Sequence, residues 1–280
     1  MAYPLVMLTT HTPSNRLAAA AIALAVAMPI AADTPTDPPA EPSGSGLDAS
    51  PVDIADRRQL FVDRHLIEAI DGVELRLGTP RDEGPVFRFD EPWEGPFSGY
   101  STIVDDGERL RLYYRGLPEA GKDGTDREVT CVAFSDDGLT WTRPTLRLFE
   151  VDGTRDNNVV LADAAPFTHN LTPFLDTRPD VDPSERFKAL GGSATSGLVG
   201  WVSPDGLRWR KLDEIPLLTE GMFDSQNVAF WSEAEQRYVC YLRTWTGEGY
   251  SGIRTVSRAT SKDFREWTTP EPMDFGPGEL

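Results

Sequence analysis

The segment Ser135-Asp-Asp-Gly-Leu-Thr-Trp141 decides the fold, because its pattern recurs twice further along the chain. The second copy is Ser203-Pro-Asp-Gly-Leu-Arg-Trp209, and a looser third copy is Ser261-Lys-Asp-Phe-Arg-Glu-Trp267. The three tryptophans lie 68 and 58 residues apart. Asp and Ser side chains cap the backbone amides of tight turns, and Gly accepts a positive φ. A turn repeated at this spacing indicates a repeated supersecondary unit.

Strand-like runs rich in β-branched and aromatic residues surround each turn. Three such runs precede each turn, and a fourth follows its Trp at 142–149, 210–218 and 268–275. Four antiparallel strands in roughly 50–70 residues are the unit of a propeller blade. We therefore predict an all-β fold, a β-propeller of four-stranded antiparallel blades, with blades at 97–150, 167–218 and 224–275.

Two other β architectures and the small number of blades bear on this prediction. A β-sandwich would not repeat the same turn and Trp, and a β-solenoid would repeat at about 20–30 residues. Three blades are fewer than the roughly four to eight that close a propeller ring. Either residues 52–98 add further sheet, or the chain is a shortened form of a longer propeller, and we favour the second interpretation.

The N-terminal residues predict an export signal and a linker rather than part of the fold. Residues 1–32 carry one charge, Arg16, and an apolar run from Leu17 that ends in small residues, as in an export signal. Residues 33–51 are rich in Pro, Ser and Gly and predict a disordered linker, which leaves 52–280 for the propeller. We expect a secreted or periplasmic protein. A single membrane anchor is the alternative, although the run is short for a span.

Composition excludes several classes of partner. The chain has 280 residues, with 27 Lys and Arg against 45 Asp and Glu, for a net charge of −18. Such a surface repels nucleic acid and anionic lipid, so we expect neither as a partner. No Cys/His cluster has zinc spacing and we expect no cofactor, although the many acidic residues would allow a structural calcium ion. Cys131 and Cys240 lie in apolar runs and are expected to be buried free thiols.

Candidate site residues lie where each blade begins. The first strand of each blade lines the channel of a propeller, so the entry segments 93–100, 167–170 and 223–227 should face a common pocket. They combine carboxylates, an imidazole, amides and aromatic rings, which together suit a sugar. The binding candidates are Trp93, Tyr100, Arg115, His169, Asn170, Gln226, Asn227 and Arg243.

The three turns, the Gly-Tyr-Ser entry at 99–101 and the Phe-Asp-Ser-Gln-Asn entry at 223–227 resemble five-bladed propeller glycoside hydrolases. This is the invertase, levansucrase and arabinanase superfamily, near glycoside hydrolase families 32 and 43. The resemblance covers about residues 57–275 and implies that about three of five blades are present. It also implies one catalytic carboxylate from each of the first three blades. Glu94 and Asp224 fall near the first and third of these positions, but the second blade offers His169 and Asn170 instead.

Glycoside cleavage needs one carboxylic acid to protonate the leaving oxygen and one carboxylate as base or nucleophile. We predict Asp224 as the acid, because Met222, Phe223 and Trp231 would desolvate it, and Glu94 as its partner. His169 would tune Asp224 or bind a hydroxyl. The predicted function is a secreted glycoside hydrolase acting on a poly- or oligosaccharide by paired-carboxylate chemistry.

Each candidate also has a structural interpretation. Asp224 would serve as a turn cap, and Glu94 as a solvated loop residue. Arg115 and Arg243 would form ion pairs between blades, or reach an acidic sugar. The alternative function is a non-catalytic carbohydrate-binding or cell-surface interaction propeller.

Overall fold

The computed structural model describes residues 66, 67, 69–119 and 124–274. The predicted export signal at 1–32 and linker at 33–51 lie outside these residues. The chain divides into two compact units, 1–78 and 79–280. In the first unit, residues 66, 67 and 69–78 contain no helix or strand. Among the described residues of the whole chain, no helix is long and apolar enough to cross a membrane.

Three four-stranded antiparallel sheets form the described part of the second unit, and each follows chain order. The first has β1 (Gly99–Asp105), β2 (Leu110–Gly116), β3 (Val129–Ser135) and β4 (Val159–Leu161). The second has β5 (Thr172–Leu175), β6 (Phe187–Ser193), β7 (Gly197–Ser203) and β8 (Arg210–Lys211). The third has β9 (Val228–Ser232), β10 (Arg237–Trp245), β11 (Arg254–Ser261) and β12 (Glu271–Pro272). Two short 3-10 helices, η1 (Phe167–His169) and η2 (Pro183–Glu185), flank β5.

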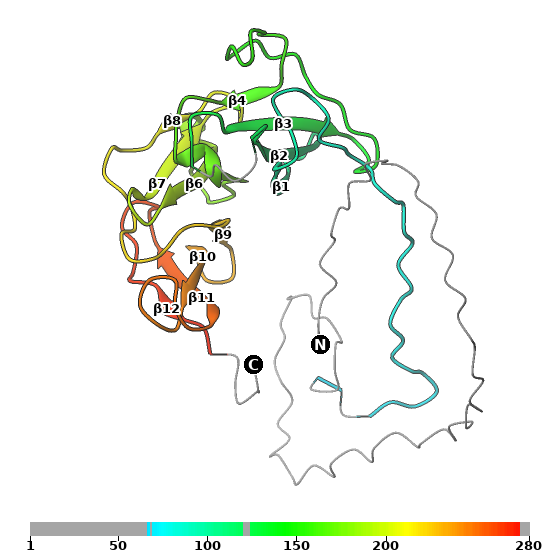
Figure 1. Ribbon diagram of the computed structural model, residues 1–280. Helices are drawn as coiled ribbons and strands as arrows, with labels where there is room; N and C mark the ends of the chain where they lie inside the picture. Colours follow the sequence, from blue (N-terminus) through cyan, green and yellow to red (C-terminus); the bar gives the residue numbers. More distant parts are fainter. Residues whose placement is uncertain (1–65, 68, 120–123, 275–280) are drawn as a thin grey trace, which may run out of the picture. The chain divides into compact units, whose positions relative to one another are not determined.

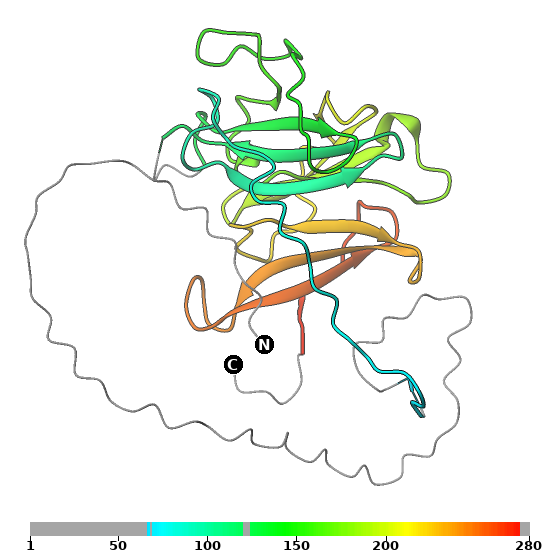
Figure 2. The same cartoon turned by 90° about the vertical axis from the view of Figure 1, so that its right-hand side faces the viewer.

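The sheets are arranged as successive blades. The second sheet lies between the first and the third (Figure 1), and its first strand, β5, contacts both β1 and β9. Figure 2 shows the long strands of the first sheet, in green, and of the third sheet, in orange, as separate layers. The structure therefore confirms an all-β propeller of four-stranded antiparallel blades.

The repeated Ser and Asp side chains form the turns as the sequence predicts. In the first turn, the amide of Gly138 donates to Oγ of Ser135 at 2.8 Å. The amides of Leu139 and Thr140 donate to Oδ1 of Asp137 at 2.8 and 2.7 Å. Gly138 has a φ of 75°, which few side chains tolerate. The same contacts recur at Ser203 and Asp205 and at Ser261 and Asp263.

Apolar side chains from neighbouring sheets fill the space between blades. Tyr113 and Val132 of the first sheet pack with Phe187 of the second, and the ring of Trp209 lies 6.3 Å from that of Tyr113. The second and third blades share a larger cluster, whose buried members are Phe174, Leu190, Leu198, Leu218, Phe223, Ala229, Tyr238, Cys240, Leu242, Ala259 and Phe264. Burying an aromatic or large aliphatic side chain contributes about 1.5–3 kcal/mol, so these layers hold the blades together.

The prediction for the fourth strand of the first blade was wrong. The expected run 142–149 meets β3 only through one bridge, between Phe134 and Thr142. Pro144 in this run has no N–H to donate to a neighbouring strand. The sheet is instead completed by β4, beyond the expected blade end at 150. In the second and third blades the fourth strands, β8 and β12, fall inside the expected runs but span only two residues each.

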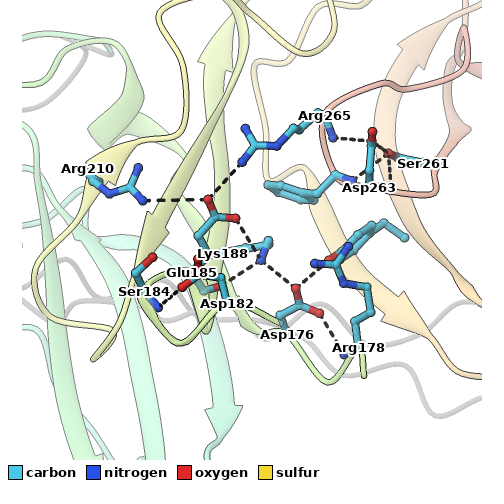
Figure 3. A network of polar contacts seen from close by, with 12 residues as sticks. Asp176, Arg178, Asp182, Ser184, Glu185, Lys188, Arg210, Ser261, Asp263 and Arg265 are labelled. Carbon is cyan, nitrogen blue, oxygen red and sulfur yellow. Dashed lines mark hydrogen bonds and ion pairs between the residues drawn. The ribbon is translucent and has the colours of Figure 1, made fainter. Parts of the chain in front are cut away.

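A buried ion pair of the second blade lies just after the C-terminal end of β5, where the third blade packs against it (Figure 3). Nζ of Lys188 lies 2.7 Å from Oδ2 of Asp176, and the two side chains are 1% and 0% exposed. The hydroxyl of Tyr238, on β10, donates to the same Asp176 oxygen at 2.6 Å. Arg265 of the third blade also reaches Glu185 of the second. These polar contacts fix how the two blades are placed against each other.

Candidate functional site

Entry segments of all three blades meet at the N-terminal ends of the first strands, β1, β5 and β9. The hydroxyl of Tyr100, at the start of β1, donates to the main-chain carbonyl of Asp224 at 3.2 Å. The ring of Tyr100 packs edge-on against the ring of His169, with centroids 5.3 Å apart. Tyr100, His169 and Asp224 come from the first, second and third blades, so residues distant in the sequence share one place in the fold.

Unusual backbone at two of these entries sets the direction of the side chains. Tyr100 has a φ of 49° and Phe223 a φ of 54°, which is strained for residues with a Cβ. The register of β1 against β2 shifts between Gly99 and Thr102, around Tyr100. Phe223 is fully buried in the cluster between the second and third blades, while the next side chain, Asp224, is 26% exposed. The strained turn therefore separates a core residue from a site residue.

Asp224 forms an ion pair with Arg243 of β10. Nε of Arg243 donates to Oδ1 of Asp224 at 3.1 Å, and Nη2 contacts Oδ2. This differs from the sequence prediction, in which apolar neighbours desolvate Asp224, because Phe223 and Trp231 pack into the core instead. In the ion pair Asp224 is a charged carboxylate, which is the form that acts as a base or nucleophile, whereas a general acid must carry a proton.

Arg115 and His169 lie together beside Tyr100. The guanidinium of Arg115 lies over the ring of Tyr100, 4.6 Å from its centroid, and Nη2 donates to the carbonyl of Phe97 at 2.9 Å. Nη1 of Arg115 is 3.0 Å from Nδ1 of His169. The same Nδ1 lies 2.9 Å from Oε1 of Glu128, a side chain with no exposure to solvent.

Sequence reasoning missed Glu128. The residue directly precedes the apolar run of β3, and its histidine partner is 41 residues further along the chain. Thr130 pairs with Arg115 across β3 and β2, so Glu128, two residues before Thr130, lies on the same side of the sheet as Arg115. The available signal was a charged residue directly before a buried strand, and this signal did not reveal that His169 is its partner.

The three amide candidates differ in what they contact. Asn170 is buried, and its Nδ2 donates to the carbonyls of Gly192 and Ser225 at 2.9 and 3.0 Å. Asn227 is also buried and donates to the carbonyl of Ser225 at 2.9 Å. These two amides hold the entry loop of the third blade rather than facing solvent. Gln226 is partly exposed, and its Nε2 donates to Oγ1 of Thr102 at 2.9 Å.

Glu94 and Trp93 are not brought to this place. Glu94 is fully buried, and Nε and Nη2 of Arg143 donate to its two carboxylate oxygens at 2.9 and 2.8 Å. The hydroxyl of Tyr114 also donates to Glu94, and Nε1 of Trp93 donates to Oδ1 of Asn158 at 2.9 Å. All of these partners belong to the first blade. The structure thus corrects the expected pairing of Glu94 with Asp224, because the charge of Glu94 is already neutralised within the first blade.

A groove of about 470 Å³ runs along the first strands of the three blades. Gln226 belongs both to this groove and to the site, so the two are continuous. Ile103, Val228 and Phe230 line the groove and are exposed. The polar lining residues are Ser101, Thr102, Asp105, Thr172, Thr177 and Gln226. Apolar faces beside hydroxyl and amide groups suit a polyhydroxylated ligand.

The described residues offer no cluster of side chains that could bind a metal ion. Within 66, 67, 69–119 and 124–274, no group of three or more His, Cys, Asp or Glu residues could hold a metal ion. The structural calcium ion remains a prediction from composition.

Comparison with known proteins gives structural likenesses only. No family model matches the chain, and no curated protein matches it. A glycosyl hydrolase from Bacteroides ovatus is similar in structure, with a TM-score of 0.46, 18% identity, and coverage of 70% of this chain and 60% of that chain. An N-acetylgalactosamine deacetylase from F. plautii, in complex with blood group B trisaccharide, has a TM-score of 0.43, 16% identity, and coverage of 65% and 56%.

A fructofuranosidase from Schwanniomyces occidentalis, complexed with fructosylnystose, is also similar, with a TM-score of 0.41 and 16% identity. The match covers 61% of this chain and 31% of the fructofuranosidase. The chain thus spans less than two thirds of each of these proteins. At this level the likeness does not assign an activity to this chain.

Proposed function

We propose that this chain is a carbohydrate-active propeller that hydrolyses glycosidic bonds of a poly- or oligosaccharide where the entry segments of its blades meet. The observation that carries the proposal is the contact of Tyr100 with both His169 and Asp224. It brings together an aromatic ring, an imidazole and the loop that carries Asp224, and this loop continues to Gln226 in a groove of about 470 Å³. The export signal predicted at 1–32 would place this activity outside the cytoplasm.

The contacts favour particular roles in the proposed reaction. Asp224, charged in its ion pair with Arg243, is the carboxylate that acts as base or nucleophile. His169 is the proposed proton-transfer group: once its Nε2 has taken up a proton, the imidazolium can donate that proton to the leaving oxygen. Tyr100 connects the two entry segments, with its ring against the imidazole of His169 and its hydroxyl on the main chain of Asp224. Glu94 is assigned to the structure of the first blade rather than to catalysis.

Hydrolysis of a panel of glycosides by the full chain tests this proposal. Asp224→Asn removes the charge with little change of volume and should lower kcat/KM at least about 100-fold, as expected for loss of an acid–base group. Asp213→Asn is the matched control, because Asp213 is an exposed aspartate of the second blade. Thermal unfolding of both variants checks that the fold is retained. Full activity of a folded Asp224→Asn variant would contradict the assignment.

A non-catalytic carbohydrate-binding propeller is the second candidate. Two observations favour it: Arg243 already engages the carboxylate of Asp224, and Glu94 is fully buried. Isothermal titration with oligosaccharides distinguishes the two candidates. Binding without turnover that persists in Asp224→Asn would support the binding module, whereas turnover that is lost in Asp224→Asn would support the hydrolase.

A further inference from the structure

Two groups compete for one nitrogen of His169. Oε1 of Glu128 lies 2.9 Å from Nδ1, and Nη1 of Arg115 lies 3.0 Å from the same atom. A protonated Nδ1 donates to the carboxylate and cannot accept a hydrogen bond from the guanidinium. An unprotonated Nδ1 accepts a hydrogen bond from the guanidinium and cannot donate one to the carboxylate. The contact geometry therefore allows two tautomers of the neutral imidazole, and the surroundings decide between them.

The environment of Glu128 favours the proton on Nδ1. The Glu128 side chain has no exposure to solvent, and its Oε2 has no hydrogen-bond partner among the described residues. Arg115 is 3.8 Å from Oε1, which is an ion-pair distance rather than a hydrogen bond. If Nδ1 carried no proton, a buried carboxylate would lose its hydrogen bond from the histidine, and an unpaired buried charge is costly. Arg115, in contrast, also donates to the carbonyl of Phe97.

The second nitrogen of His169 is then left for a ligand. Among the described residues, no side chain or backbone group bonds Nε2, and Nε2 is not one of the buried atoms that lack a partner. Because Nε2 has no partner among these residues and is not among the buried atoms, it contributes to the 10% of the His169 side chain that is exposed. The ring of Tyr100 packs against the imidazole and restricts its rotation.

We propose that Glu128 is a positioning residue that holds neutral His169 with its proton on Nδ1, so that the lone pair of Nε2 faces the site. A carboxylate that fixes a histidine tautomer in this way directs the opposite nitrogen toward its substrate. Nε2 accepts a hydrogen bond or a proton from a hydroxyl of the ligand, or donates the proton once it is protonated. That a sugar supplies this hydroxyl rests on the proposed function, whereas the tautomer itself does not.

Among the described residues, two charged side chains contact this histidine. Glu128, before β3, and Arg115, on β2, contact its Nδ1 directly. The main chain of Asp224 contacts the hydroxyl of Tyr100, and the charge of its carboxylate is paired with Arg243. The tautomer is therefore set by the balance between one carboxylate and one guanidinium, and removing the carboxylate should reverse it.

Long-range ¹H–¹⁵N correlation spectra of the full chain, labelled at histidine nitrogen, measure the tautomer directly. The chain has three histidines, and His169→Asn assigns the signal of His169 by its loss. The expected result at a pH where His169 is neutral is the Nδ1–H tautomer. In Glu128→Ala the signal should change to the Nε2–H tautomer, because Arg115 then donates to Nδ1.

Two further variants complete the experiment. Glu128→Gln keeps a side-chain carbonyl as acceptor and should keep the Nδ1–H tautomer even if Glu128→Ala does not fold. Glu108→Ala removes an exposed glutamate from the turn between β1 and β2 and should leave the tautomer unchanged. The Nε2–H tautomer in the unmodified chain, or an unchanged tautomer in folded Glu128→Ala, would overturn the proposal. Absence of glycosidase activity would not change these spectra, so failure of the proposed function is separate.

Discussion

The hydroxyl of Tyr100 is hydrogen-bonded to the main-chain carbonyl of Asp224, 124 residues further along the chain. This contact joins the first blade directly to the entry of the third, although the second blade lies between them in the sequence. The same tyrosine packs against His169 of the second blade. One side chain thus links the entry segments of all three blades.

Removing the Tyr100 hydroxyl should weaken this link without disturbing its ring. Tyr100→Phe keeps the aromatic contacts with Arg115 and His169, and loses the hydrogen bond at 3.2 Å. We expect the free energy of unfolding to fall by about 0.5–1.5 kcal/mol, as for one ordinary hydrogen bond. Urea unfolding measures it. Tyr250→Phe, at a tyrosine that is 56% exposed, is the control, and equal losses in both variants would contradict this role.

Lys188 should be one of the most sensitive positions between the second and third blades. Lys188→Met removes the ammonium that neutralises Asp176, and both side chains are buried (Figure 3). Removing one partner of a buried ion pair costs about 3–5 kcal/mol, because the other charge stays buried. Lys211→Met, which breaks the ion pair with exposed Glu214, should cost no more than about 1 kcal/mol. Denaturant unfolding of both variants compares them, and similar small losses would refute the expectation.

The blades were predictable because their signals are local. Each Ser and Asp of a repeated turn bonds amides two or three residues away, so the turn is encoded within seven residues of sequence. The position of β4 was not predictable from such local signals, because Val159 pairs with Cys131 only after an intervening loop. Pro144 was visible in the expected strand, and its missing N–H was the signal that should have excluded it.

The site was predictable only where its residues enter a first strand. That rule found Tyr100, His169 and Asp224, which the structure brings together. It failed for Glu94, because the burial of that carboxylate depends on Arg143, 49 residues away. The rule also gave no account of Glu128, whose importance lies in a contact with His169 across two blades. Tertiary partners of this kind leave no pattern in a single sequence.

The first repeated turn should make stability depend on acid. Hydrogen bonds from the amides of Thr140 and Leu139 lower the pKa of Asp137 to about 2, from 3.8. Because the folded-state pKa is the lower one, the stabilisation is complete above about pH 4 and is lost as the pH falls toward 2. Asp137→Asn should therefore cost less at pH 2 than at pH 6, as measured by the unfolding temperature. A difference that stays constant over this range would show that the turn does not contribute in this way.

Both cysteines should be unreactive in the folded chain. Cys131 and Cys240 are free and fully buried. Burial raises the pKa of the Cys240 thiol to about 12 and raises that of Cys131 well above its usual value, so little thiolate exists at neutral pH. We expect a chromogenic disulfide reagent to detect no thiol in the native chain and two in urea. Rapid reaction of either thiol without denaturant would contradict the burial.

The central claim is that three blades assemble one carbohydrate site at their entry segments. A crystal structure of the full chain with a bound oligosaccharide tests it most directly. The account predicts a sugar ring in contact with Tyr100, His169 and Asp224, extending along the groove toward Gln226. A sugar bound elsewhere on the chain, or a complex in which Tyr100 contacts neither His169 nor Asp224, would contradict it.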